Sequence, residues 1–158
     1  MNKEQQQVKD FMIKADQECP EKPTIPLLAI RMLRVRLMAE ELIEFADACG
    51  VELNIGVISG VSVFQKSPFN VDLTLAYDAI LDLEVVNIGN AVAFGLDLEP
   101  GFAEVHRSNM SKFIDGYKRE DGKWCKGTSF SPPDLARIIL IQAGVLRDGS
   151  QYYEDNLP

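Results

Sequence analysis

Three glutamates occupy positions of a helical segment where its periodicity predicts hydrophobic residues. Residues 33–48 have helical spacing, and their apolar stripe passes from Leu37 to Glu40 and Glu44. Glu41 lies about 100° around the same helix from Glu40. A buried ionised carboxylate is unfavourable unless it is paired with a cation or bound to a metal. The segment therefore predicts a helix face that binds a cation.

A second helical segment also carries acids in place of apolar residues. In residues 72–94, the stripe through Leu75 and Val85 also contains Asp78 and Asp82, which share one face. Two such helices would repel each other, because each close pair of like charges costs about 4 kcal/mol at ~4 Å and an effective dielectric near 20. A divalent cation between the helices reverses this repulsion. Because the ligands would all be carboxylate oxygens, we expect Mg²⁺, with Mn²⁺ as the alternative.

Two other interpretations of these acids are weaker. The acids could form solvated faces of surface helices, but the neighbouring positions on both stripes are apolar. They could belong to a di-iron carboxylate bundle, which needs a Glu-x-x-His on each of two helices. The only histidine is His106, which lies on neither acidic segment. A magnesium or manganese site is therefore favoured over both.

The elements that must position the acids are predicted to be helices, and the fold class to be all-α, a bundle of four to five helices. Helices are expected at residues 3–18, 27–48, 72–94 and 99–109 and from residue 131 onward. Ser131 is expected to cap the last helix, with Pro132 in its first turn. Its buried face should contain Leu135, Ile138 and Ile139.

The remaining segments are predicted to be connections. Residues 53–73 contain several glycines and serines and indicate an irregular connection with a short strand or a lid. Residues 117–127 contain an Asp-Gly turn and indicate a short hairpin or an ordered loop. Residues 1–147 are predicted to form a single domain, followed by a polar tail at residues 148–158.

Composition narrows the class of protein. The chain has 158 residues, of which 46% are hydrophobic, and this composition is ordinary for a globular domain. Its net charge of -8 disfavours nucleic acid and anionic membranes as partners. The first residues do not resemble a signal peptide, and no segment has the length of apolar sequence that spans a membrane. The three cysteines form no CxxC pair and indicate reduced thiols, so we expect a cytoplasmic protein.

The acidic pattern resembles that of the MazG-like all-α nucleoside triphosphate pyrophosphohydrolases, which include phosphoribosyl-ATP pyrophosphohydrolase and the dimeric dUTPases. Their usual motif is EExxE followed by ExxD, and Glu40-Glu41-x-x-Glu44 is similar to its first half. The second half differs, because Ala79 stands where the superfamily carries an acid. Asp78 is the expected substitute, beside Asp82. Three later blocks look like one branch of the superfamily: residues 104–112, 121–127 and 131–135.

The resemblance implies a Mg²⁺-dependent hydrolysis of an NTP or dNTP between the α- and β-phosphates, giving the monophosphate and pyrophosphate. It implies that the metal ligands are Glu41, Glu44, Asp78 and Asp82. Glu40 would act as the general base or orient the attacking water, and the roles of Glu40 and Glu41 could be exchanged. The base and the sugar of the substrate stay open.

Basic residues in the later blocks would bind the triphosphate. The expected substrate-binding residues are Asn109, Lys112, Lys123 and Lys126. Trp124 is expected to anchor its loop by packing, and His106 to be structural or exposed. Arg34 and Arg36 are expected to pair with acids of a neighbouring helix or subunit. The resemblance also implies a homodimer or homotetramer.

A second functional hypothesis remains beside hydrolysis. The chain could be a non-catalytic bundle that binds nucleotide or metal and acts through oligomerisation. Ala79, in place of an expected acid, favours this alternative. The two hypotheses differ in turnover and agree on binding.

Overall fold

The fold is mostly helical, with two small antiparallel hairpins. The structure, a computed structural model, describes residues 1–56, 60–66 and 71–147. Its elements are α1 (Lys3–Lys14), α2 (Leu28–Ala48), β1 (Val51–Gly56), β2 (Gly60–Gln65), α3 (Leu73–Ala93), α4 (Leu98–Ser111), β3 (Tyr117–Lys118), β4 (Trp124–Cys125) and α5 (Leu135–Gln142). The five helices agree with the prediction, but the β1–β2 hairpin makes the fold not purely all-α. The predicted tail at 148–158 lies outside the described residues.

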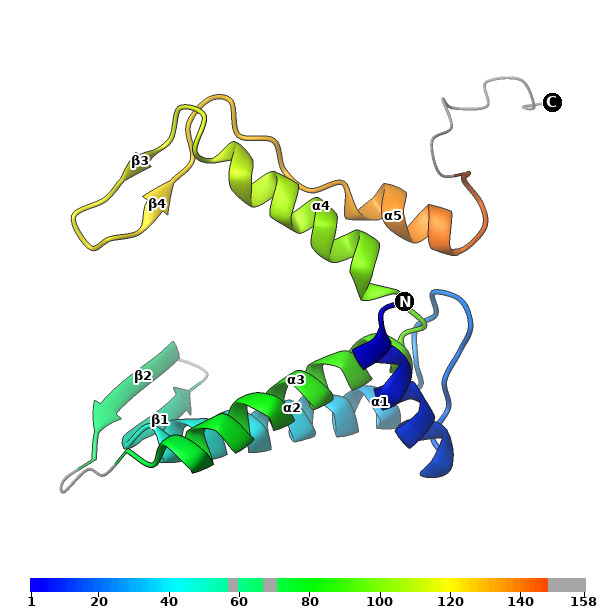
Figure 1. The fold of residues 1–158 in the computed structure, drawn as a ribbon, viewed down its shortest axis with the longest axis horizontal. Coiled ribbons are helices and arrows are strands. Elements are labelled where there is room, and N and C mark those ends of the chain that lie inside the picture. Colours follow the sequence, from blue (N-terminus) through cyan, green and yellow to red (C-terminus); the bar gives the residue numbers. More distant parts are fainter. Residues whose placement is uncertain (57–59, 67–70, 148–158) are drawn as a thin grey trace.

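The helices form two layers that meet near the N-terminus. One layer contains α1, α2 and α3 with the β1–β2 hairpin, and the other contains α4 and α5 with the β3–β4 hairpin (Figure 1). Helices α2 and α3 run antiparallel and contact each other along their length, and α1 packs on α3. The core of this layer consists of Val8, Met12, Ile88, Val92 and Ala93.

Local sequence explains where α3 begins and ends. The Asp72 carboxylate accepts hydrogen bonds from the backbone N–H groups of Thr74 and Leu75, at 2.8 and 3.1 Å, as a helix N-cap does. At the other end Gly95 takes a φ of +64°, which a glycine adopts without strain. A Cβ on Gly95 would also collide with the backbone carbonyl of Lys22. Both predicted boundaries of this helix are therefore confirmed.

Over most of α3 the buried stripe lies one residue away from the stripe that the sequence suggested. Ala76, Ala79 and Val86 are buried, whereas Asp78 and Asp82 are exposed. The prediction that these two acids lie within the buried face was therefore wrong. Small alanines let α2 approach α3 closely, and the acids border this contact on its open side.

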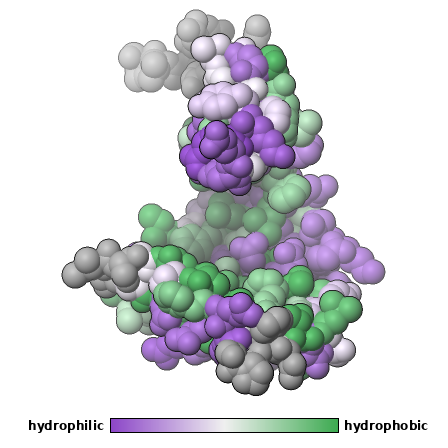
Figure 2. Space-filling model, turned by 90° about the vertical axis from the view of Figure 1, so that its left-hand side faces the viewer, coloured by the Kyte–Doolittle hydropathy of each residue, from purple (hydrophilic) through white to green (hydrophobic). Residues whose placement is uncertain are grey.

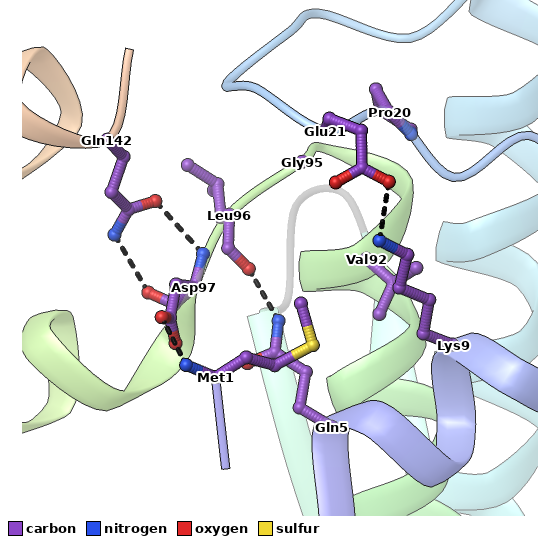
Figure 3. Close-up of a pocket in the computed structure, with 10 residues that line it drawn as sticks. All are labelled: Met1, Gln5, Lys9, Pro20, Glu21, Val92, Gly95, Leu96, Asp97 and Gln142. Atoms are coloured by element: carbon purple, nitrogen blue, oxygen red, sulfur yellow. Dashed lines mark hydrogen bonds and ion pairs between the residues drawn. The ribbon is translucent and has the colours of Figure 1, made fainter. Parts of the chain in front are cut away.

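Two glutamine side chains hold the linker between the layers. Gln5, which is 1% exposed, donates from Nε2 to the Leu96 carbonyl at 2.6 Å and accepts from the Leu98 N–H at 3.1 Å. Gln142 pairs with both backbone groups of Asp97 at 2.9 Å (Figure 3). These bonds surround a cavity of about 270 Å³ and join the start of α1 and the end of α5 to the same three residues.

The connection between α2 and α3 is more regular than predicted. Strands β1 and β2 pair in register from Val51↔Gln65 to Gly56↔Gly60, so the irregular connection expected at 53–73 is in large part a β-hairpin. The spacing of glycines and serines hid the alternating Val, Ile and Phe residues that favour strands. Residues 57–59 and 67–70 lie outside the described part of the chain.

The first and last helices differ from their predicted bounds. Helix α1 ends at Lys14, and Asp16 beyond it has a φ of +55°, which no helix continues. Helix α5 begins at Leu135 with Asp134 as its N-cap, so the predicted start at Ser131 was wrong. Pro132 precedes Pro133, and a residue before a proline avoids the helical region, so the helix does not begin at Pro132. Ser131 also donates its backbone N–H to the Ser111 hydroxyl at 2.9 Å.

Apolar side chains remain exposed in both layers, including those expected to be buried on α5. The exposed residues include Met32, Val35, Ile43, Leu75, Tyr77, Ile80, Phe102, Phe113, Leu135 and Ile139, while Ile138 is half-buried. Viewed from the side of the hairpins, the surface is hydrophilic at the end of the α4–α5 layer, and the recess between the layers has hydrophobic residues on one side and hydrophilic residues on the other (Figure 2). No single helix within the described ranges has both the length and the apolar character to cross a membrane. In the same part of the chain, α3 and α4 meet these criteria when taken together, but they are bent by 111° relative to each other.

Candidate active site

Glu41 is the centre of the acidic group on α2 and α3. It is half-buried on the side of α2 that faces α3, while Glu40 and Glu44 are exposed beside it. Burial raises the pKa of the Glu41 carboxyl above its ordinary value. Four other carboxylates raise this pKa further, in decreasing order Glu44, Asp82, Glu40 and Asp78. The two helices therefore bring all five predicted acids into one electrostatic group.

Residues of α2 and α3 around Ala79 line a pocket. This pocket has a volume of about 310 Å³, and its lining includes Glu44 of α2 together with Asp78 and Ala79 of α3. Ala79 is only 5% exposed because it faces α2 directly. Asp78 lies at the exposed rim of the same pocket. The carboxylates of Asp78 on α3 and Glu44 on α2 therefore border the same pocket.

The acids provide oxygen ligands but not a closed metal cage. Within the described residues, no three His, Cys, Asp or Glu side chains converge closely enough to hold a metal ion on their own. The charges that act on Glu41 are all negative, and a divalent cation would reverse their effect. An all-carboxylate set that leaves room for water and phosphate oxygens fits Mg²⁺ or Mn²⁺. The donor chemistry therefore suits the expected metal.

A comparison with protein families shows to which family the chain belongs. A profile of the phosphoribosyl-ATP pyrophosphohydrolase family matches residues 6–109, about two thirds of the chain. The chain belongs to this family. No curated protein matches the chain. Family membership makes the protein a pyrophosphohydrolase that acts on a nucleotide-like substrate.

The region matched by the family covers the acids but ends before the basic residues. It runs from the start of α1 into α4, and Asn109 is its last residue. Three lysines follow it: Lys112 at the end of α4, Lys123 in the β3–β4 hairpin and Lys126 directly after β4. The acidic group therefore lies in the part of the chain shared with the family. The lysines lie in the part that follows.

Two of the four predicted substrate-binding residues lie over one aromatic ring, and a third is hydrogen-bonded to one of them. The Lys126 ammonium lies 4.1 Å from the centre of the Phe130 ring, and the Lys112 ammonium lies 6.0 Å from it. Lys112 also donates to the Asn109 side-chain oxygen at 2.7 Å. The side chain of Lys123 makes no hydrogen bond or ion pair with any residue that the structure describes, and it lies on the hairpin turn.

Asp115 and Trp124 hold the backbone beneath these lysines. The Asp115 carboxylate accepts hydrogen bonds from the Thr128 hydroxyl at 2.6 Å and the Ser129 N–H at 2.9 Å. These bonds, that of Thr128 first, lower the pKa of Asp115. The Trp124 N–H donates to the Lys112 carbonyl at 2.8 Å, and its ring lies 4.8 Å from that of Phe113, as expected of a packing anchor.

Sequence reasoning missed the roles of Asp115 and Phe130. The signal for Asp115 was an acid followed by Gly116, with Gly127, Thr128 and Ser129 downstream. Both glycines are required by space, because a Cβ on Gly127 would collide with the Asp115 carboxylate and one on Gly116 with the Lys112 carbonyl. Phe130 gave no comparable signal, because a single aromatic residue in a loop has many possible roles.

Three other residues singled out in the sequence, Arg34, Arg36 and His106, differ in their contacts and exposure. Arg34 was expected to pair with an acid but instead donates to the Asn90 side-chain oxygen and the Val86 carbonyl, both at 2.8 Å. Arg36 is exposed and forms no ion pair within the described part of the chain. His106 is exposed, as expected. Arg34 therefore contributes to the contact between α2 and α3, on the side of the acidic group.

The acidic group and the lysines belong to different layers. No hydrogen bond or ion pair joins the two groups among the described residues. Figure 1 shows α2 and α3 in one layer, with α4 and the β3–β4 hairpin in the other. In a single chain the two groups are therefore separate sites.

Proposed function

We propose that the protein is a Mg²⁺-dependent nucleoside triphosphate pyrophosphohydrolase, which converts an NTP or dNTP and water into the monophosphate and pyrophosphate. One observation carries the proposal. Five carboxylates on α2 and α3 gather around Glu41, within the region that the pyrophosphohydrolase family matches. A nucleotide polyphosphate is a substrate whose metal complex suits such a site.

The acids divide into two proposed roles. Glu41, Glu44, Asp78 and Asp82 would hold the cation, which neutralises charge on the phosphates and lowers the pKa of bound water. Glu40, on the exposed side of α2, would accept the proton of the attacking water. The water oxygen bonds to phosphorus, and the bridging oxygen leaves with pyrophosphate. The inward position of Glu41 supports its assignment as the ligand and that of Glu40 as the base.

The lysines around Phe130 would hold the phosphate chain. Lys112 and Lys126 lie on one ring, and Lys123 lies on the adjacent turn, so three ammonium groups belong to one end of the second layer. Asn109 would donate its amide N–H₂ to a phosphate oxygen, since its carbonyl oxygen already accepts from Lys112. Ammonium groups bind phosphate as point charges, which favours the triphosphate part of the substrate over its base.

We also propose a homodimer or homotetramer. The support is the large number of exposed apolar side chains in both layers, since large apolar patches on a protein surface mark contact surfaces. The separation of the acids from the lysines gives a second reason, because another copy can supply the missing group. Light scattering tests the proposal, and a mass equal to that of one chain would contradict it.

The test of the activity is a panel of nucleoside triphosphates with Mg²⁺, in which pyrophosphate and monophosphate are measured together. We expect at least one nucleotide to give the two products in equal amounts, and Glu41→Gln to abolish the reaction. Glu84→Gln is a matched control, since Glu84 is an exposed acid on α3 outside the acidic group. Turnover of no nucleotide, or normal turnover by Glu41→Gln, would refute the proposal.

A non-catalytic nucleotide- or metal-binding bundle is the second candidate. Two observations favour it: Ala79 in place of an acid, and side chains that do not converge into a closed metal group within the described residues. It predicts that Mg²⁺ and nucleotide raise the melting temperature while no product forms. Thermal-shift titrations beside the product assay separate it from the hydrolase.

A further inference from the structure

Arg34 is buried between α2 and α3 in a space shaped for its guanidinium group. It is 6% exposed, and it donates from Nε to Asn90 Oδ1 and from Nη2 to the Val86 carbonyl, both at 2.8 Å. Gly89 makes the space. A Cβ at position 89 would lie 3.0 Å from Arg34 Cζ and closer still to Nη2. Three residues of α3 therefore surround the guanidinium group of Arg34: Val86 and Asn90 accept its hydrogen bonds, and Gly89 leaves room for it.

Among the described residues, no acid forms an ion pair with Arg34. Asp16 and Glu18 line the same pocket as Arg34, but neither is paired with it. Burial of a charge without an opposite charge is unfavourable, and an apolar side chain in the same place often gives equal or greater stability. Stability alone therefore does not explain an arginine at this position.

Helix register offers an explanation. The alanines that line this side of α3 are small and alike, so they distinguish weakly between neighbouring registers of α2. The Val86 carbonyl and the Asn90 amide are single points on α3, and only one register presents both to Arg34. Buried polar contacts fix register in this way in coiled coils.

The register that Arg34 selects is the one that assembles the acids. On α2, Glu41 lies seven residues after Arg34, about two turns away on the same inner side. On α3, which runs in the opposite direction, Asp82 lies seven residues before Gly89. The contact of Arg34 with Gly89 therefore places Glu41 opposite Asp82. A slip of one turn, about 5.4 Å, would separate them.

We propose that Arg34 is a positioning residue: with Gly89 and Asn90 it fixes the register of α2 against α3 and so sets the distances among the acids of the candidate active site. The consequence for catalysis rests on the proposed hydrolase function. The register itself does not, and it can be measured in the absence of substrate and metal.

Electron paramagnetic resonance measures this register directly. Spin labels are placed at Arg36 and Thr74, which are exposed and distant along the helix axes, after Cys19, Cys49 and Cys125 are replaced by serine. Dilution with unlabelled protein isolates distances within one chain. We expect one narrow distance in the parent protein and, in Arg34→Leu, a shift of about 5 Å or a broad distribution that includes it.

Three further variants make the test specific. Gly89→Ala should shift the distance as Arg34→Leu does, because it displaces the guanidinium group, and the double variant should shift no further than Arg34→Leu alone. Arg34→Lys replaces the leucine variant if that variant does not fold. It keeps the charge but cannot reach both partners at once, so the distance should shift or broaden here too. Ile88→Ala, which opens a cavity in the core of the same layer, should keep the parent distance although it lowers stability.

The functional readout is the Mg²⁺ concentration for half-maximal activity. It should rise about tenfold in Arg34→Leu and stay unchanged in Ile88→Ala, as expected for loosened ligand positions. An unchanged distance distribution in folded Arg34→Leu would overturn the inference and leave the hydrolase proposal intact. A parent protein without turnover would refute the hydrolase proposal and leave the register result valid.

Discussion

The acids around Glu41 and the charged side chains around Phe130 differ in whether each charge has a partner that attracts it. Around Glu41 every neighbouring charge has the same sign, and the pKa of this carboxyl is raised as a result. Around Phe130 the charges lie against groups that attract them: Lys126 against the ring, Lys112 against the Asn109 oxygen, and Asp115 against hydroxyl and amide donors. The repulsion among the acids around Glu41 is unfavourable without a cation, as is typical of a site that binds a ligand. The charged groups around Phe130 all have hydrogen-bond or ring partners, so this region keeps its structure without a ligand.

The regions also differ in what holds them. The acids depend on the packing of α2 against α3, which involves residues more than fifty positions apart in the sequence. The lysines are held by contacts within residues 109–130. The acidic region lies within the family match and the lysines after it. Under the proposed function, the acids would carry the chemistry shared with the family and the later region would bind the phosphates of the substrate.

The largest effect on the difference between the two regions is expected from Glu41→Gln, which removes the central charge of the acidic region. We expect turnover to fall more than about 100-fold, since a metal ligand is lost. Without metal the variant should be at least as stable as the parent, because repulsion is relieved. Steady-state kinetics and thermal melts check both effects, and Glu84→Gln should match the parent in each. A less stable but active Glu41→Gln would contradict the comparison.

Lys126→Met tests the other region. Loss of one charged contact to phosphate is worth about 1.4 kcal/mol, so KM should rise about tenfold while kcat changes less than about twofold. Lys118→Met in the neighbouring strand β3 is the control, since it removes an exposed lysine of the same hairpin. Equal KM values for the two variants would show that the Phe130 lysines do not bind substrate.

The pH dependence of stability should separate the regions further. The folded-state pKa of Glu41 is raised, so its contribution to stability is present below the unfolded pKa of about 4.3 and is lost as pH rises through the folded value. Mg²⁺ should offset this loss, so the rise in melting temperature on adding Mg²⁺ should grow with pH through this window. Melts with and without Mg²⁺ measure it. A Glu41→Gln protein with the same pH-dependent rise would argue against this source.

The smallest expected effect comes from Trp124→Phe. The variant keeps a ring against Phe113 but loses the hydrogen bond to the Lys112 carbonyl, a net loss of about 1 kcal/mol. We expect faster amide exchange in the β3–β4 hairpin and a rise in KM of less than about threefold. The response of the melting temperature to Mg²⁺ should not change. A weaker Mg²⁺ response in this variant would show that the two regions are coupled.

The sequence predicted best where local chemistry decides the structure. Asp72 as a cap and Gly95 as a terminator gave the bounds of α3, and the Asp-Gly turn gave the β3–β4 hairpin. The acidic stripe was assigned one residue away from its place because neighbouring helix positions differ by only about 100°, and alanines do not mark which of them is central. The prediction thus found the five acids but not that Glu41 alone faces inward.

Contacts between distant residues were outside the reach of sequence reasoning. The partners of Arg34 lie on α3, and the periodicity of α2 carries no information about them. The segment 131–134 was predicted to be helical, but its backbone bonds to α4 through Ser111 and Glu104. Local propensity alone cannot anticipate such tertiary contacts.

Manganese binding followed by electron paramagnetic resonance tests the central claim most directly, since it needs no knowledge of the substrate. Mn²⁺ is titrated into the parent protein, Glu41→Gln and Glu84→Gln, and the signal of free Mn²⁺ is measured. If the acids around Glu41 form the metal site, the parent and Glu84→Gln will bind Mn²⁺ alike, and Glu41→Gln will bind it at least about tenfold more weakly. Equal binding by all three proteins would contradict the assignment of this acidic group as the metal site.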